Sequence, residues 1–205
     1  MVATGATRDA RRKLPAERHD ELLAKAVELS RTGGLGAVTL RKVAAELGVT
    51  PGLVSHYFSS AELLITAAFR TAATEDLDRA RARVGDEPTP TAKITALMDY
   101  ALDEDSMEAS ALWLEAWSLG RENPALAAEA AALTEQWLVF IAEIVGAGND
   151  TGEFHAAHPD VAARRLLTMI DGLGAQMVVR AVAPAELKHI AGSYVTAELH
   201  LNRRD

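Results

Sequence analysis

The sequence contains no cysteine. This absence excludes disulfide scaffolds, thiol nucleophiles and thiolate metal sites, and a reducing cytoplasm is the expected compartment. Residues 1–13 are polar and basic, and no apolar run approaches 18 residues, so neither a signal peptide nor a membrane span is expected. Sustained alternation of apolar and polar residues is also missing, which argues against a fold rich in strands.

The composition favours a packed, helical protein. Hydrophobic residues make up 49% of the 205 residues and charged residues 24%, which is typical of a globular core. The net charge of −8 is unevenly distributed. Residues 1–58 hold nine lysines and arginines against six carboxylates, whereas residues 59–205 hold twelve against twenty-three. Only the N-terminal part is therefore expected to meet a polyanion.

Apolar periodicity and capping residues predict about nine helices. Ser59 and Glu62 fit a capping box at the start of the fourth helix, and a loop is expected from Gly146 to Pro159. The predicted helices begin at Pro15 and after Thr39, and run over about 51–58, 59–84, 91–104, 107–120, 124–145, 160–181 and 185–200.

The segment from Thr39 to Phe58 has the spacing of a helix-turn-helix unit. Ala44 is followed by three residues and Gly48, then by five residues and Val54. A small residue is needed where the two helices cross, and glycine suits a turn with positive φ. Val54 would pack the second helix against the first. The second helix of such a unit enters the major groove of DNA.

The candidate DNA contacts lie on and around that second helix. Hydroxyl, imidazole and phenol groups suit contacts to phosphates or base edges, and Gly52 allows close backbone approach. The alternative is a tight helical hairpin with no DNA role. The candidate residues are Thr39, Arg41, Lys42, Thr50, Pro51, Gly52, Leu53, Ser55, His56 and Tyr57.

These residues resemble the TetR family of bacterial one-component regulators. The resemblance runs from Gly33 to Phe69 and rests on Thr39, Arg41 to Ala44, Leu47 to Val49, Val54, His56 to Phe58 and Glu62 to Leu64. It implies a three-helix DNA-binding head, a larger helical body that binds ligand, and a homodimer held by the last two helices. Residues 1–58 would be the head, and residues 59–205 the body.

One position departs from the family pattern. The family usually has a lysine that meets a DNA phosphate where this chain has Ala61. Its loss predicts a shallower salt dependence of DNA binding. Arg41, Lys42 and the arm formed by Arg8, Arg11, Arg12 and Lys13 would compensate, unless the arm is only a solvated tail.

The body resembles the BetI-like type. Trp113 and Trp117 precede Asn123 to Leu126, and Ile170 to Leu173 match as well. An acidic segment from Asp99 to Glu115 beside the tryptophans suggests a pocket for a cation, although a solvated acidic face over core tryptophans explains the same pattern. The candidate pocket residues are Met98, Met107, Trp113, Trp117, Trp137, Phe140, Met169 and Met177.

No enzyme or cofactor motif is found. The chain lacks H-E-x-x-H, G-x-S-x-G, a P-loop and G-x-G-x-x-G, so no cofactor is expected. His155 and His158 form an H-x-x-H with Glu153 and Asp160 nearby, but they fall in a predicted loop, which disfavours a metal site.

The sequence therefore predicts an all-α transcriptional regulator, most simply a repressor. Two heads in a dimer would read a palindromic operator in double-stranded DNA. A small apolar or cationic effector would favour the conformer whose heads are wrongly spaced for DNA. The alternative is a helical small-molecule-binding protein or enzyme with no DNA role, the enzyme relying on His155, His158 and nearby carboxylates.

Overall fold

The computed structural model describes residues 13–201, and within this range it contains nine α-helices, two short 3₁₀ helices and no strand. The expected all-α fold is confirmed. The α-helices are α1 (Pro15–Gly33), α2 (Leu40–Leu47), α3 (Pro51–Tyr57), α4 (Ala61–Gly85), α5 (Pro90–Ala101), α6 (Met107–Gly120), α7 (Pro124–Thr151), α8 (Pro159–Val178) and α9 (Pro184–Glu198).

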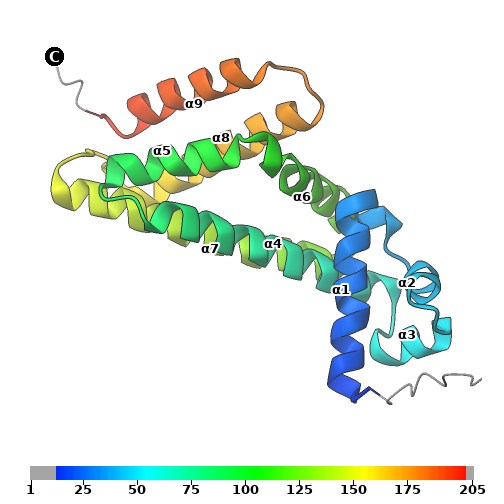
Figure 1. The fold of residues 1–205 in the computed structure, drawn as a ribbon. Helices are drawn as coiled ribbons and strands as arrows, with labels where there is room; N and C mark the ends of the chain where they lie inside the picture. The colour runs from blue at the N-terminus through cyan, green and yellow to red at the C-terminus, as the bar shows by residue number, and fades with distance from the viewer. Residues whose placement is uncertain (1–12, 202–205) are drawn as a thin grey trace, which may run out of the picture.

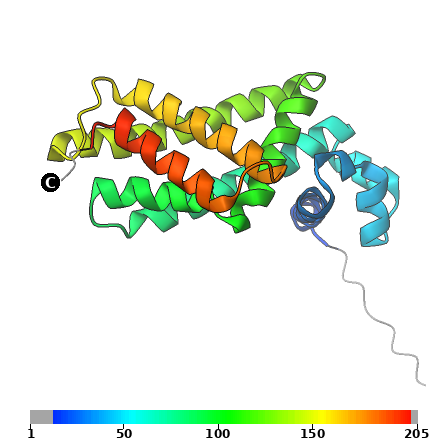
Figure 2. The same cartoon turned by 90° about the horizontal axis from the view of Figure 1, so that it is seen from above.

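The helices form a small head at one end of a longer body (Figure 1). In the head, α2 and α3 pack beside α1, which stands across the end of the body. In the body, α4 and α7 lie against each other, while α8 packs on α6 and α7 and α9 packs on α5 and α8. Figure 2 shows the head and the end of α9 at opposite ends of the molecule. The body therefore separates α3 from the C-terminal helix.

Two apolar cores hold this arrangement together, and α4 takes part in both. One core joins Leu22 and Val54 of the head to Phe69 in the first half of α4, all of which are fully or almost fully buried. The other fills the body and begins with Leu77 in the second half of α4. Trp113 of α6 packs against both cores. The head is thus anchored to the body by continuous apolar packing rather than by a free linker.

The start of α4 differs from the capping box expected at Ser59. Ser60 is the N-cap, and its hydroxyl accepts a hydrogen bond from the Leu63 amide at 3.2 Å. Ser60 has the extended backbone of an N-cap, with φ −148° and ψ 162°. Glu62 therefore lies in the first turn but does not close a capping box with Ser59.

The expected loop from Gly146 to Pro159 is wrong over its first half. Helix α7 continues to Thr151, and Gly152 ends it in the left-handed conformation with φ 74°. Gly148 is buried inside the helix because the ring of Phe154 folds back onto it. A Cβ at this position would lie 1.9 Å from Cδ2 of Phe154. This glycine serves close packing and does not stop the helix.

The fifth helix is shorter than expected, and its end has a local cause. Helix α5 ends at Ala101, and a 3₁₀ turn occupies Glu104–Ser106. The carboxylate of Asp103 accepts a hydrogen bond from the Asp105 amide at 3.1 Å and caps this turn. The chain then enters α6 at Met107, as expected.

Helix α7 is more apolar than was expected from the sequence, which predicted no membrane-spanning segment. Helix α7 is long and apolar enough to cross a membrane by length and composition, with a mean hydropathy of 1.4 over its most apolar 18 residues. Of that window, 44% is buried inside the protein. Helix α7 packs on α4, α5, α6 and α8. This packing explains its apolar character, because a core helix is apolar on several sides.

Candidate DNA interface and effector cavity

The turn between α2 and α3 has the geometry that its sequence predicts. Gly48 ends α2 with φ 64° and ψ 31°, and its amide donates to the carbonyl oxygens of Ala44 and Ala45. Ala44 and Val54 are buried at the crossing of the two helices. The positive φ explains the glycine, since an L side chain is strained there. The unit is therefore a rigid helix-turn-helix.

Both helices of the unit begin at a threonine cap. The hydroxyl of Thr39 accepts from the Lys42 amide at 3.1 Å, and that of Thr50 accepts from the Leu53 amide at 3.3 Å. These bonds satisfy amides that the first turn leaves free. Each cap fixes where its helix begins.

The expected DNA-contact residues form an exposed surface on this unit. Leu53 and Tyr57 are half-buried, and the other eight residues are exposed: Thr39, Arg41, Lys42, Thr50, Pro51, Gly52, Ser55 and His56. The ring of His56 meets that of Tyr57 edge-on, with 5.3 Å between centroids. His19 of α1 stacks on Phe58 at 5.0 Å and supports the end of α3. The exposed side chains therefore project from helices that are held in place by buried residues such as Val54 and Phe58.

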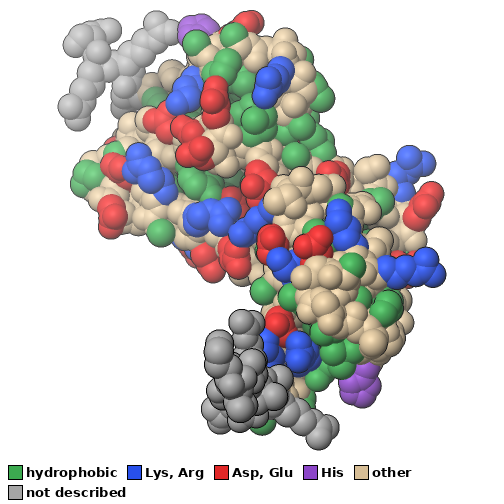
Figure 3. All heavy atoms as spheres, turned by 45° about the vertical axis from the view of Figure 1, so that its right-hand side comes forward, with side chains coloured by type: hydrophobic (Ala, Val, Ile, Leu, Met, Phe, Trp, Pro, Cys, Tyr) green, Lys and Arg blue, Asp and Glu red, His purple; other side chains and the backbone are tan. Residues whose placement is uncertain are grey.

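The basic arm is only partly described. Arg8, Arg11 and Arg12 lie outside the described residues. Lys13 lies 2.5 Å from Glu21 of α1, so its charge is already paired within the head. On the face drawn in Figure 3, basic and acidic side chains mix across the junction between head and body.

A cavity lies in the body between α6, α7 and α8. Its empty volume is about 680 Å³, part of which opens to solvent. Trp113, Trp117 and Trp137 line it, together with the two carboxylates Asp76 and Asp171. We call this the tryptophan cavity. The remaining lining residues are Tyr100, Ala101, Ser106, Ala109, Ser110, Leu114, Thr134, Leu167, Ile170 and Gly174.

Close packing of α6 on α8 shapes one wall of the tryptophan cavity. A Cβ at Gly174 would lie 2.9 Å from Oγ of Ser110 and 3.4 Å from its Cβ. The glycine therefore lets the two helices approach. On α6, the ring of Trp113 lies 5.8 Å from that of Trp117, and it meets the ring of Phe69 of α4 edge-on at 5.1 Å.

The eight expected pocket residues divide into two groups. The three tryptophans line the cavity, while Met98, Phe140 and Met177 are buried in the body core and Met107 and Met169 pack against it. The sequence reading missed Asp76, Tyr100 and Asp171. A signal exists for the aspartates, because Asp76 and Asp171 each fall on an apolar stripe of their helix.

The acidic segment lies elsewhere than expected. None of its carboxylates, including Glu108 and Glu115, lines the tryptophan cavity. Glu115 instead accepts a hydrogen bond from the Leu35 amide, at the point where α1 ends. Glu108 pairs with Arg31 of α1, whose Nε lies 3.4 Å from Oε1 of Glu108. Both carboxylates therefore connect the body to the head.

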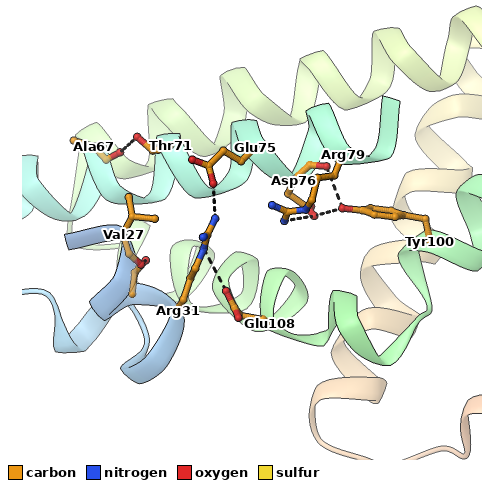
Figure 4. Close-up of polar contacts among 10 residues, drawn as sticks. Val27, Arg31, Ala67, Thr71, Glu75, Asp76, Arg79, Tyr100 and Glu108 are labelled. Carbon is orange, nitrogen blue, oxygen red and sulfur yellow. Dashed lines mark hydrogen bonds and ion pairs between the residues drawn. The ribbon is translucent and has the colours of Figure 1, made fainter. Parts of the chain in front are cut away.

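Polar contacts near the cavity join α1, α4, α5 and α6 (Figure 4). Arg31 binds Glu75 of α4 as well as Glu108. Directly after Glu75, Asp76 accepts from the Tyr100 hydroxyl at 2.6 Å and from Arg79 at 3.2 Å, both through Oδ1. Burial raises the pKa of Tyr100 to about 12, and the hydrogen bond to Asp76 adds to this. Neighbouring residues on α4 therefore face the head and the cavity.

No metal centre is found in the described part of the chain. No group of three or more histidine, aspartate and glutamate side chains within residues 13–201 is arranged to hold a metal ion. His158 precedes α8 as its N-cap residue, with extended backbone and no side-chain cap.

The fold and the exposed helix-turn-helix define a DNA-binding transcriptional regulator. Residues 22–76 match the family model for bacterial regulatory proteins of the tetR family. Residues 90–200 match the model for the C-terminal part of BetI-type transcriptional repressors, which covers more than half of the chain. The chain belongs to the TetR family and carries a BetI-type body. It is a transcriptional regulator and not an enzyme.

Curated relatives agree with this assignment. The HTH-type transcriptional regulator BetI 2 of Chromohalobacter salexigens is 27% identical over 172 residues, covering 79% of each chain. BetI of Ectopseudomonas mendocina is 26% identical over 196 residues, covering 91% of this chain and 95% of the relative.

Solved structures share the fold. A transcriptional regulator from Saccharomonospora viridis, crystallised in complex with choline, matches with a TM-score of 0.79 and 22% identity over 92% of this chain and 100% of that one. A TetR regulator from Haloarcula marismortui matches with a TM-score of 0.76 and 20% identity over 89% and 98%.

Proposed function

We propose that this regulator is a cytoplasmic, homodimeric repressor that a small organic cation releases from its operator. The observation that carries the effector class is the tryptophan cavity, which combines three indole rings with two carboxylates. Aromatic faces attract cations, most strongly where water is excluded. The relative from Saccharomonospora viridis binds choline, a quaternary ammonium ion of this kind. Choline is therefore the first probe.

Binding to DNA would be carried out by α3 and by the exposed residues of α2. We infer that residues 1–58 form the DNA-binding domain and residues 59–205 the effector and dimerisation domain. Two copies of α3, about one helical turn of DNA apart, would read a palindromic operator. Arg41 and Lys42 are exposed and would bind phosphates in place of the lysine that Ala61 replaces.

The dimer half rests on α8 and α9. On these two helices, Leu166, Leu173 and Leu187 face the internal core. Val161 of α8, Val179 at the end of α8 and Ile190 of α9 are exposed. We infer that the exposed faces of α8 and α9 pair with those of a second copy, because a four-helix contact would cover these apolar side chains.

The first experiment is selection of bound duplexes from a random DNA pool, followed by a salt titration of the enriched sequence. A sequence-specific dimer enriches a palindrome, and its affinity falls steeply with salt because phosphate contacts release counterions. Choline is then added to the complex and dissociation is followed by fluorescence anisotropy. No enrichment, or weak binding to every sequence, would contradict the operator proposal.

A further inference from the structure

The two carboxylates of the tryptophan cavity stand in different surroundings. Oδ1 of Asp76 accepts two hydrogen bonds, from the Tyr100 hydroxyl at 2.6 Å and from Arg79 at 3.2 Å (Figure 4). Burial raises the pKa of Asp76, and the guanidinium of Arg79 and the Tyr100 hydroxyl offset part of this effect. A cation placed beside Asp76 would also be repelled by Arg79. Asp76 is therefore a poor partner for a cationic effector.

Asp171 has no such partner. Within residues 13–201 its carboxylate makes no hydrogen bond or ion pair, although it is half-buried in the cavity wall. Burial alone raises the pKa of Asp171 to about 6. A carboxylate that is desolvated without a partner destabilises the charged form. A bound cation would supply the missing partner.

No other charge on the cavity wall competes for this role. The titratable groups that line the cavity are Asp76 on α4, Tyr100 on α5 and Asp171 on α8. Helices α6 and α7 contribute no charged group to the lining. Since Arg79 pairs with Asp76, Asp171 is the carboxylate of the described lining that lacks a cationic partner.

We propose that Asp171 is the charge-pairing residue of the effector site, and that it makes the cavity selective for a monocation over a neutral molecule of the same shape. Asp76 is a positioning residue, which holds α4 to α5 through Tyr100. This inference rests on the proposed function, because it names the residue that recognises the proposed cation. The indole rings enclose the effector and attract its cationic group, and Asp171 supplies the opposite full charge.

A quaternary ammonium ion suits this division of roles. It donates no hydrogen bond, so it needs aromatic surface and one opposite charge and no array of acceptors. A dication would need a second free carboxylate, and Asp76 is already paired with Arg79. The cavity is therefore expected to prefer choline to a diamine of similar length.

The test compares choline with 3,3-dimethylbutan-1-ol, in which carbon replaces the charged nitrogen. Binding of each to the full-length protein is measured by titration calorimetry at pH 7.5. The variants are Asp171→Asn, Asp76→Asn and, as matched control, Asp160→Asn, which removes an exposed carboxylate from α8 outside the cavity. Thermal unfolding of each variant verifies that it is folded.

The wild type and Asp160→Asn should prefer choline by at least about tenfold, the effect of one charge pair at intermediate dielectric. In Asp171→Asn this preference should fall by about tenfold, to the part that the indole rings supply, while Asp76→Asn keeps the wild-type preference. A preference for choline that stays at the wild-type level in Asp171→Asn, or is lost in Asp76→Asn alone, would overturn the assignment of Asp171 and leave the cationic effector class standing. A wild type that binds neither probe, or both equally, would overturn that class and this inference with it.

Discussion

The guanidinium of Arg31, on the first helix of the head, lies with Nε 3.4 Å from Oε1 of Glu108 on α6 of the body. The same guanidinium binds Glu75, the residue before Asp76 on α4. Helix α6 also carries Trp113, a wall of the tryptophan cavity. Arg31 of the head therefore forms ion pairs with α4 and with α6, and both of these helices contribute residues to the cavity wall. A ligand that moves α4 or α6 would act on α1 through this contact.

Arg31→Met is expected to weaken coupling between effector and DNA. The substitution keeps an unbranched side chain but removes the guanidinium, so Glu75 and Glu108 lose their shared cation. Because these side chains are partly exposed, the loss of stability should be at most about 1 kcal/mol. Choline should still bind, yet lower operator affinity by a smaller factor than in the wild type. Anisotropy titrations of operator DNA with and without choline measure this factor.

Lys25→Met is the matched control, because Lys25 pairs with Glu28 inside α1 and does not reach the body. It should leave the factor unchanged. Equal coupling in Arg31→Met and Lys25→Met would show that Arg31 carries no part of the signal.

His56→Ala tests the exposed end of α3. The imidazole is exposed beside Tyr57, and it does not line the tryptophan cavity. Operator affinity should fall by about 1–3 kcal/mol, while the melting temperature and choline affinity stay the same. His158→Ala, which changes an exposed histidine that precedes α8, is the control and should retain full DNA binding. Unchanged operator affinity in His56→Ala would remove α3 from the interface.

The pH dependence of stability should show the titration of the Asp171 carboxylate. Its pKa is about 6 in the folded protein and about 4 in an unfolded chain, so the folded state binds more protons between these values. Stability from this group is therefore lost as pH rises from about 4 to above 6. At pH 7.5, Asp171→Asn should have a higher melting temperature than the wild type, and its free energy of unfolding should be larger by at most about 3 kcal/mol. The difference should vanish near pH 4.

Thermal unfolding at several pH values measures this difference, with Asp160→Asn as the control for removing a charge from α8. A difference between Asp171→Asn and wild type that stays constant from pH 4 to 7.5 would show that Asp171 does not titrate as described.

Two glycines of α7 should respond to alanine in opposite directions. Gly146 has open space around it, so Gly146→Ala should stabilise the helix by up to about 1 kcal/mol. Gly148→Ala would place a Cβ against the ring of Phe154 and should destabilise the protein by about 1–3 kcal/mol. Urea unfolding of both variants measures the two effects. Stabilisation by Gly148→Ala would show that Phe154 does not pack there.

The sequence predicted local structure better than it predicted the cavity. The helix-turn-helix was predictable because Ala44, Gly48 and Val54 each meet a backbone or packing requirement set by nearby residues. The long α7 was not, since glycine is usually a breaker and the partner that fills Gly148 is a ring six residues away. Tertiary packing here overrides the local signal.

The cavity wall shows the same limit. Two tryptophans four residues apart on α6 predicted an aromatic surface, but the carboxylates beside this surface come from α4 and α8. Asp76 and Asp171 are 95 positions apart, and only the packing of α6 and α7 between α4 and α8 brings them to one cavity. The acidic segment suggested a cation pocket because it lies next to the tryptophans in the sequence. In the structure, its residues Glu108 and Glu115 contact the head instead.

Cation binding and operator binding are expected to oppose each other in this protein. The most direct test measures choline affinity by titration calorimetry with and without saturating operator duplex. Because coupling is reciprocal, operator DNA should weaken choline binding by the same factor by which choline weakens operator binding. A choline affinity that operator DNA leaves unchanged would show that the effector site and the DNA site are not coupled.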